Sequence, residues 1–590
     1  MVWYNIFIEF STNNNEIYGG NFTVAEYKLY NSRKIHDLRE MLDESASLYP
    51  TNAAFMQRIG GKYRAYTFAR FRNEVYSLGE ALTARGFLGK KIIVTGENCY
   101  AWCLSYMTTV CGLGVVVPVD KDIPSEELAN IARISDAALI LYSPKYEAKL
   151  ASLPENVTKI SFELLPELVK IGSDLLAAGS SRYSEVSIDI DAMCSLIFTS
   201  GTTGVSKGVM LSQRNICANL YNLAKMVKVT KEDTALSVLP LHHVYECTCG
   251  FLYPVYCGAT VAFSEGVRHI MKNAKEVSPT KIICVPLLIE TMYKKIWANI
   301  RKKGIEDKVK TIIKATDALP TEAMRKAAKR RVFAEIHASF GGKLNMLVSG
   351  GAGIDPEVIA GMRGFGFKVI QGYGLTESAP LAAVNHDSFY NDRSAGLVLP
   401  GGELKIINVG EDGTGEICYR GDNVMLGYYG RPDLTAEVKK NGWLHTGDVG
   451  YIDERGFLII TGRRKNVIVR YNGKNVFPEE LEAYIGRDPL VAEAVVLGIR
   501  NEKKNDYDIV AAIKVDTDAA KDTFGSDYSR ELAERKINET VAEINRTVQS
   551  YKRIDITLFP DEDFPKTSSR KVKRFEVPDM LMKYYLEKVK

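Results

Sequence analysis

Strand-like and helix-like segments alternate along much of the chain, and this alternation most constrains the fold. From Lys90 to Asp120 an apolar run precedes a helical stretch and a second, valine-rich apolar run. The pattern recurs from Pro124, Lys281 and Lys343. Apolar strands separated by helices are typical of βαβ units, which build parallel sheets covered on both faces. We therefore predict an α/β fold with a large N-terminal domain of doubly wound βαβ subdomains.

After about Pro400 the pattern changes to short strands with close turns, at Asp412-Gly413 and Arg455-Gly456. These features predict a small β-rich lobe. Beyond Gly462 an α+β pattern continues to the end of the sequence, so a domain boundary is expected near 461–465. The predicted organisation is an N-terminal extension, a large domain and a mobile α+β C-terminal domain, at residues 1–37, 38–462 and 463–590.

The composition excludes several classes of protein. Of 590 residues, 46% are hydrophobic and 25% are charged, which suits folded domains and argues against bulk disorder. Lys and Arg number 76 against 72 Asp and Glu, so the net charge of +4 gives no reason to expect a nucleic-acid partner. There is no run of about 18 apolar residues. The N-terminal stretch of the sequence has no basic segment before its apolar residues, and it includes the acidic Glu9. Neither a transmembrane helix nor a signal peptide is predicted.

Cysteine usage and one basic segment bear on location and partners. Ten cysteines occur without a CxxC pair, which fits reduced thiols in a cytoplasmic protein. The segment from Arg301 to Arg331 has eleven Lys or Arg and four Asp or Glu in helix-compatible sequence. It is interpreted as a solvated helix face, with peripheral contact to an anionic membrane surface or an acidic partner as the alternative. The sequence is compatible with a monomer or a homodimer.

The strongest chemical signal is the stretch SLIFTSGTTGVSKGVMLS, Ser195 to Ser212. An apolar strand runs into a loop of small and hydroxyl residues, in which backbone amides can approach an anion and Lys207 supplies charge. The loop is not a Walker A motif, because Gly208 follows the lysine where that motif requires Ser or Thr. We interpret it as a phosphate-binding loop rather than a flexible turn.

Two further clusters follow strand-like segments. In KVIQGYGLTESAP, Tyr373, Thr376 and Glu377 come directly after an apolar strand, where open α/β sheets bind ligands. In GWLHTGDVGYIDERGFLIITGRRKNVIV, Asp448 precedes Arg463 by fifteen positions. An aspartate can accept both hydroxyls of a ribose, and an arginine can bind a nucleotide oxygen. The alternative for the first cluster is a surface loop with a capping Thr and Glu, and Asp448 and Arg463, each taken alone, are more typical of charges in exposed turns.

Together these segments, in this order, resemble the adenylate-forming acyl-CoA synthetase superfamily over about Leu38 to Arg574. FTSGTTGVSKG is similar to the family's pyrophosphate loop, QGYGLTES to its Mg²⁺ and adenylate motif, and GWLHTGD to its ribose motif. TGRRKNVIVRYNGKNVFPEELE resembles its hinge and thiol-side motif. The arrangement most resembles the long-chain fatty acid–CoA ligases, and the resemblance implies ATP, Mg²⁺ and coenzyme A.

The resemblance also implies site residues. Those expected around the nucleotide are Thr199, Ser200, Gly201, Thr202, Thr203, Gly204 and Lys207 at the triphosphate, Gly351, Ala352, Tyr373 and Gly374 at the adenine, and Asp448 and Arg463 at the ribose. Thr376 and Glu377 would face the phosphates, with Thr202 and Glu377 as metal ligands. His243 would lie near the acyl carboxylate, Lys465 at the hinge, and Gly473 near the pantetheine thiol.

The segment DFPKTSSRKVKR resembles the family's Pro-x-Thr-x-x-Gly-Lys pattern, which makes Lys571 the expected adenylation lysine. Arg570 stands where the family has glycine, so the loop has less conformational freedom and an additional cation. Lys566 is the alternative.

The implied reaction joins a carboxylic acid, expected to be a medium- or long-chain fatty acid, to AMP with release of pyrophosphate. A thiol then displaces AMP. The expected acceptor is coenzyme A, with the phosphopantetheine thiol of an acyl carrier protein as the alternative. A non-catalytic ATP or acyl-adenylate binding protein and a P-loop NTPase are rival interpretations. The first is disfavoured by the catalytic-type residues, and the second by Gly208.

Overall fold

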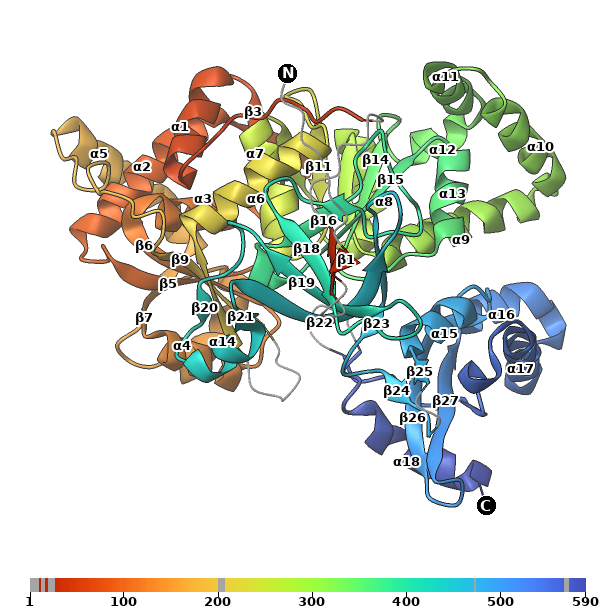
Figure 1. The fold of residues 1–590 in the computed structure, drawn as a ribbon. Coiled ribbons are helices and arrows are strands. Elements are labelled where there is room, and N and C mark those ends of the chain that lie inside the picture. The colour runs from red at the N-terminus through yellow and green to blue at the C-terminus, as the bar shows by residue number, and fades with distance from the viewer. Residues whose placement is uncertain are drawn as a thin grey trace.

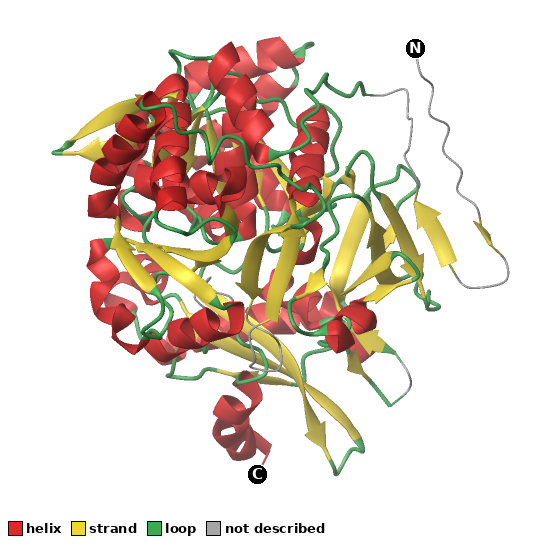
Figure 2. Ribbon diagram, turned by 90° about the vertical axis from the view of Figure 1, so that its left-hand side faces the viewer, coloured by secondary structure: helices red, strands yellow, loops and turns green. Residues whose placement is uncertain are grey.

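The computed structural model describes residues 10–11, 16–19, 27–199, 207–471, 474–566 and 572–589. Two mainly parallel sheets with helices on their faces form the centre of the large domain (Figures 1 and 2). This architecture confirms the predicted α/β class. Within the described ranges, no helix is both long enough and apolar enough to cross a membrane, and the ten cysteines form no disulfide.

The first sheet has the strand order β20-β10-β9-β6-β5-β7-β8. Strands β5, β6, β7, β8 and β9 pair in parallel, whereas β10 pairs antiparallel with β9 and β20. Its strands are β5 (Lys90–Thr95), β6 (Gly114–Val119), β7 (Ala137–Tyr142), β8 (Thr158–Ser161), β9 (Met193–Thr199), β10 (Lys207–Ser212) and β20 (Gly427–Tyr428). The helices of this part are α1 (Leu38–Leu48), α2 (Phe68–Ala84), α3 (Tyr100–Thr108), α4 (Ser125–Ser135), α5 (Leu165–Ala177) and α6 (Gln213–Met226).

Strand β5 shows why these segments read as continuous apolar runs. Ile92 and Val94 pack in one core cluster and Ile93 in another, and all three are fully buried. Because successive side chains point to opposite faces, a strand covered on both faces needs apolar residues at every position.

The second sheet has the order β17-β16-β15-β14-β13-β11-β12-β3-β4. Its strands are β3 (Ala53–Ile59), β4 (Lys62–Thr67), β11 (Thr234–Ser237), β12 (Thr260–Phe263), β13 (Lys281–Cys284), β14 (Met346–Ser349), β15 (Lys368–Gly374), β16 (Leu381–Val384) and β17 (Leu397–Val398). Its helices are the π-helix η4 (Glu246–Leu252), α7 (Tyr253–Cys257), α8 (Ile270–Val277), α9 (Pro286–Lys302), α10 (Glu306–Asp317), α11 (Glu322–Val332), α12 (Ala334–Ser339) and α13 (Pro356–Gly364). The basic segment is thus helical, and α10 and α11 lie at the outside of the molecule (Figure 1).

The β-rich lobe predicted after Pro400 is present. Its sheet has the order β1-β2-β18-β19-β22-β21, and β23 also pairs with β22. Asp412-Gly413 and Arg455-Gly456 lie in the turns between paired antiparallel strands, and Gly413 and Gly456 have φ of 76° and 84°. The elements are β1 (Phe10–Ser11), β2 (Glu16–Gly19), β18 (Glu403–Ile407), β19 (Gly415–Arg420), α14 (Pro432–Val438), β21 (Lys439–Lys440), β22 (Trp443–Ile452) and β23 (Leu458–Arg463).

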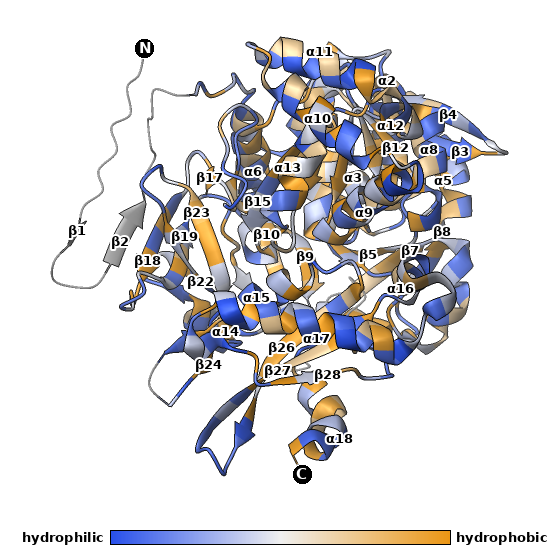
Figure 3. Cartoon of the chain, turned by 90° about the vertical axis from the view of Figure 1, so that its right-hand side faces the viewer, coloured by the Kyte–Doolittle hydropathy of each residue, from blue (hydrophilic) through white to orange (hydrophobic). Residues whose placement is uncertain are grey.

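The remaining α+β elements form the lower part of the molecule in Figure 1. They are β24 (Ile468–Val469), β25 (Asn475–Val476), α15 (Pro478–Ile485), β26 (Val491–Asn501), β27 (Asp506–Val515), α16 (Thr517–Phe524), α17 (Arg530–Thr547), β28 (Ile556–Leu558) and α18 (Val577–Val589). Helix α17 is amphipathic, with polar and apolar residues alternating around it (Figure 3). Its apolar residues Ile537, Val541 and Ile544 are buried in the core of this part.

Candidate active site

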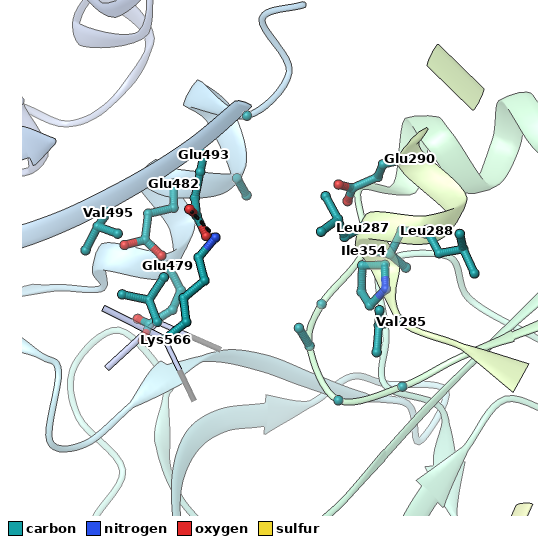
Figure 4. A pocket seen from close by; sticks show the side chains of 18 of the residues that line it. Val285, Leu287, Leu288, Glu290, Ile354, Glu479, Glu482, Glu493, Val495 and Lys566 are labelled. Carbon is teal, nitrogen blue, oxygen red and sulfur yellow. Dashed lines mark ion pairs between the residues drawn. The ribbon is translucent and has the colours of Figure 1, made fainter. Parts of the chain in front are cut away.

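A cleft of about 5630 Å³ separates the large domain from the C-terminal elements. Its walls include residues at the carboxyl ends of β13, β14 and β15, where open α/β sheets bind ligands. Figure 4 shows the two walls, with Leu287 and Glu290 on one side and Glu493 and Lys566 on the other.

Three predicted residues meet at one end of this cleft. Strand register places Asp448 of β22 opposite Arg463 of β23. The Asp448 Oδ1 atom lies 2.9 Å from Arg463 Nε, and Asp448 Oδ2 accepts a hydrogen bond of 2.7 Å from the Tyr373 hydroxyl. Asp448 is buried, whereas 56% of the Arg463 side chain is exposed. A buried carboxylate held in this way is oriented to accept hydroxyl groups from the cleft.

The electrostatics of this group follow from the same contacts. Burial and the Asp448 carboxylate raise the pKa of Tyr373 well above its ordinary value, so its hydroxyl remains a donor. The Asp448 charge also raises the pKa of Arg463. The Asp448 carboxylate therefore has one neutral donor, the Tyr373 hydroxyl, and one cationic donor, the Arg463 guanidinium.

A second group surrounds Glu377, just after β15. The Tyr428 hydroxyl donates to Glu377 Oε1 over 2.7 Å, and Lys207 Nζ lies 5.2 Å from the centre of the Tyr428 ring. Burial, followed by the Glu377 charge, raises the pKa of Tyr428. Thr376, beside Glu377, lines the same cleft, as do Thr199 and Lys207 at the ends of β9 and β10. The Lys207 ammonium thus lies near the Tyr428 ring, and the Glu377 carboxylate is bonded to the hydroxyl of the same side chain.

Tyr428 was not predicted from the sequence. It lies in β20, more than 200 positions beyond Lys207, and the antiparallel pairing of β20 with β10 brings it to this group. Tyr428 pairs with Val209, one position beyond Gly208. No short motif joins these residues, so only the strand pairing reveals the contact.

The donor chemistry around Glu377 fits magnesium. Mg²⁺ prefers oxygen ligands and is commonly held by one or two carboxylates together with substrate phosphates. Among the described residues, Tyr428 is the one hydrogen-bond donor to the Glu377 carboxylate, and it uses Oε1. The second predicted metal ligand, Thr202, lies outside the described residues.

Gly351, Ala352 and Gly374 also line the cleft. Gly351 has φ of 85°, a left-handed conformation that favours glycine. At Gly374 a Cβ atom would lie 1.8 Å from the Pro380 carbonyl oxygen, so only glycine fits. Gly351 and Gly374 therefore allow the backbone to adopt the conformation that forms this wall of the cleft.

The loop after β11 carries two histidines on the cleft wall. His243 is half-buried, and its Nδ1 accepts a 3.5 Å hydrogen bond from the Tyr245 amide. His242 Nε2 lies 3.7 Å from Asp120 Oδ2, and burial lowers the pKa of His242. Asn98 holds the loop, donating to Leu239 O at 2.6 Å and accepting from Leu241 N at 3.1 Å.

The C-terminal wall is linked to the large domain by specific contacts. Arg487 pairs with Asp355 at 2.9 Å and with Glu357 at 3.2 Å. Lys465 lines the cleft two positions after β23 ends. Lys566 pairs with Glu493 at 2.8 Å and faces the cleft (Figure 4). The remaining predicted site residues lie outside the described ranges: Ser200, Gly201, Thr202, Thr203, Gly204, Gly473 and Lys571.

A small apolar pocket adjoins the cleft. Tyr245, Gly372 and Leu381 line both spaces, and the other lining residues are mostly apolar, with Asp233, Lys281 and Ser349 among them. The pocket lies between one face of the second sheet and the helical elements α6, η4 and α7. Its free volume is about 30 Å³.

The chain matches known proteins over most of its length. A family model described as AMP-binding enzyme matches residues 42–429, and one described as AMP-binding enzyme C-terminal domain matches residues 465–584. The long-chain-fatty-acid–CoA ligase FadD15 of Mycobacterium bovis is 27% identical over 504 residues, which cover 81% of each chain. A long-chain-fatty-acid–CoA ligase of Escherichia coli O157:H7 is 29% identical over 427 residues, 70% of this chain and 66% of the relative.

Solved structures share the fold. The anthranilate CoA ligase AuaEII in complex with anthranoyl-AMP has a TM-score of 0.73 at 18% identity, covering 94% of this chain and 98% of that one. The o-succinylbenzoate coenzyme A synthetase MenE of Bacillus subtilis, in complex with ATP and magnesium ion, has a TM-score of 0.68 at 23% identity, covering 91% and 99%.

Proposed function

Because the chain belongs to the AMP-binding enzyme family, we propose that it activates a medium- or long-chain fatty acid with ATP and transfers the acyl group to coenzyme A. The fatty acid carboxylate attacks the α-phosphorus to give acyl-AMP and pyrophosphate. The thiol then attacks the acyl carbon, and AMP leaves.

One observation carries the proposal: the Tyr373–Asp448–Arg463 group and the Lys207–Tyr428–Glu377 group face one cleft, beside an apolar pocket. The first group suits a ribose and the second a chain of phosphates. The pocket suits an alkyl chain, because burying apolar surface stabilises a complex by about 25 cal/mol per Å².

The first half-reaction brings two anions together, so the site must offset negative charge. Lys207 supplies a cation next to the loop of residues 200–206, which is the proposed pyrophosphate site. Mg²⁺, when bound by Glu377 and Thr202, would neutralise phosphate charge. His243 is proposed to lie near the acid carboxylate, and Lys571 to approach it in the adenylation step.

Coenzyme A is the proposed acceptor because the relatives at 27–29% identity are named CoA ligases. Acyl-AMP is readily hydrolysed, so the site should exclude water first and admit the thiol afterwards. We propose that residues after Lys465 rotate between the two half-reactions. Gly473 would then approach the thiol.

The test is carboxylate-dependent exchange of labelled pyrophosphate into ATP without any thiol. The acids run from acetate through palmitate to aromatic acids. Exchange that is greatest with alkyl acids supports the proposal. Exchange with aromatic acids alone refutes the fatty acid assignment, and ATP binding without exchange for any acid refutes catalysis. Adding CoA or an acyl carrier protein then identifies the acceptor by thioester formation.

We also propose peripheral membrane contact through α10 and α11. Lys308, Lys310, Lys314, Lys326 and Arg331 are exposed there. Met324 and Val332 are about half exposed, at 48% and 49%, so apolar groups accompany the cations. Basic residues near an anionic membrane each contribute about 1 kcal/mol to binding.

Sedimentation with vesicles tests this contact. Binding is expected with phosphatidylglycerol vesicles and not with phosphatidylcholine vesicles, and it should weaken at high salt. K308E/K314E should lower the affinity about tenfold or more. The matched control is K503E/K521E, two exposed lysines of the C-terminal elements. An equal loss of vesicle binding in both variants would show a general charge effect and refute contact through α10 and α11.

A further inference from the structure

A buried carboxyl group lies behind the cleft wall that carries His243. Glu246 begins the π-helix η4, three positions after His243, and its side chain is fully buried. The helix packs against β11 and β13, and residues at the carboxyl ends of both strands line the cleft. Open α/β sheets bind ligands at this edge. Glu246 is therefore close to the candidate active site without being part of its surface.

A chain of hydrogen bonds joins Glu246 to the cleft wall. The Ser237 hydroxyl, at the end of β11, donates to Glu246 Oε1 over 2.6 Å. Asn98 Nδ2 donates to the Ser237 hydroxyl over 2.8 Å and also bonds the backbone of the loop after β11. Ser237 and Asn98 both line the cleft. Glu246 thus holds, through two side chains, the loop that leads to His243.

The fold leaves room for this carboxyl group but surrounds it with uncharged side chains. A Cβ atom on Gly250, one turn later in η4, would lie 2.5 Å from the Glu246 carboxyl carbon, so a larger residue would displace the carboxyl. Within the described parts of the chain, the titratable groups that interact electrostatically with Glu246 are one tyrosine and four thiols, none of them a cation: Tyr245, Cys247 and Cys249 beside it in sequence, Cys103 of α3 and Cys284 of β13.

The Glu246 carboxyl is neutral at pH 7. Burial raises its pKa to about 8, and the bond from Ser237 opposes this rise only in part. A neutral carboxyl accepts from Ser237 with Oε1 and holds its proton on Oε2, which has no hydrogen-bond partner among the described residues. Loss of this proton would place an unpaired negative charge behind the wall where the acid carboxylate and ATP are proposed to meet.

We propose that Glu246 is a positioning residue for the acid: its neutral carboxyl holds Ser237 and Asn98, and through them the loop that presents His243 to the cleft. An unpaired buried carboxylate is strongly disfavoured, so ionisation of Glu246 breaks this network, and the new charge opposes binding of the anionic acid. The proposal rests on the proposed function, which it deepens by adding a residue that makes use of the acid depend on pH.

The pH profile of pyrophosphate exchange tests the role of Glu246. The assay contains no thiol, and its acid is the alkyl acid that supports the most exchange. For the wild type, kcat/KM for the acid should fall about tenfold from pH 7 to pH 9, because the free enzyme loses one proton with a pKa of about 8. E246Q keeps the size of the side chain and cannot ionise. Its kcat/KM should lie within about threefold of the wild type at pH 7 and should not show this fall.

Ser237→Ala tests the link to the loop, and it keeps the proposal testable if E246Q does not fold. The substitution removes the hydroxyl that joins Glu246 to Asn98. At pH 7, kcat/KM for the acid should fall roughly two- to tenfold, with KM for ATP at saturating acid unchanged. Because the lost bond favours the ionised carboxylate, the fall with pH should move to higher pH. Equal changes for the acid and for ATP would show a general disturbance of the cleft and overturn the proposal.

The matched control is E80Q. Glu80 of α2 is also fully buried, accepts a hydrogen bond of 2.9 Å from Tyr183 N and does not line the cleft. E80Q should keep the wild-type pH profile. The same fall in E246Q as in the wild type, or an equally flattened profile in E80Q, overturns the role of Glu246 while the proposed function stands. Absence of exchange with every acid refutes the proposed function and this role together.

Discussion

Tyr428→Phe should weaken ATP use about tenfold while leaving the fold intact. The substitution removes the hydroxyl that donates to Glu377 over 2.7 Å, and the ring that packs near Lys207 remains. Hydrogen bonds to charged groups contribute about 1.5–3 kcal/mol. Glu377 is half-buried, so the lower end of this range applies, and about 1.4 kcal/mol corresponds to a tenfold change.

The assay is kcat/KM for ATP in pyrophosphate exchange, at saturating acid and over a range of Mg²⁺ concentrations. Because Glu377 loses the donor that orients it, the deficit should be largest at low Mg²⁺. The matched control is Tyr419→Phe. Tyr419 is fully buried and donates to Asn423 over 2.8 Å outside the cleft, so its loss should lower stability by about 1 kcal/mol without affecting kcat/KM. Wild-type exchange by Tyr428→Phe at every Mg²⁺ concentration would refute the reasoning, and so would an equal deficit in the control.

Three further predictions each concern one residue. Asp448→Asn should raise KM for ATP at least tenfold, because it removes the charge that faces Arg463 at 2.9 Å; an unchanged KM for ATP in steady-state assays would contradict this. Burial raises the pKa of Glu246 to about 8, so the folded state keeps a proton that the unfolded state loses above about pH 4.5. Stability should therefore fall as the pH rises from about 5 to 8, by up to about 1.4 kcal/mol per unit, and Glu246→Gln should flatten this decline in thermal melts. Arg487→Gln should increase tryptic cleavage between 464 and 471 a few-fold, because it removes a half-exposed link to Asp355; unchanged cleavage would show that other contacts hold the C-terminal elements.

The fold was largely predictable because its signals are local. In β5, Ile92, Ile93 and Val94 are buried on the two faces of the sheet, and the turns at Gly413 and Gly456 need positive φ, which glycine supplies without strain. Ser212 caps the N-terminus of helix α6: its Oγ accepts from Asn215 N, and the Asn215 side chain accepts from Ser212 N. Such patterns depend on neighbours in the sequence.

The candidate site could be predicted from the sequence only in part. The motifs around Lys207, Tyr373, Glu377, Asp448 and Arg463 could be identified in the sequence, and the structure places all five on one cleft. Their individual roles stay predictions. Those expected of Ser200, Thr202, Gly473 and Lys571 concern residues outside the described ranges.

The sequence by itself determined the α/β class, the β-rich lobe and the order of the motifs, because each follows from the period of apolar residues or from a short run of specific side chains. Only the tertiary structure decided that Tyr428 contacts Glu377, that Tyr245 donates to the Val348 carbonyl and that Asp233 pairs with Lys281. These three contacts join residues 48 to 103 positions apart, and they arise where strands and helices pack. Local periodicity fixes which face of an element is apolar, whereas the partner of each side chain depends on how distant elements pack together.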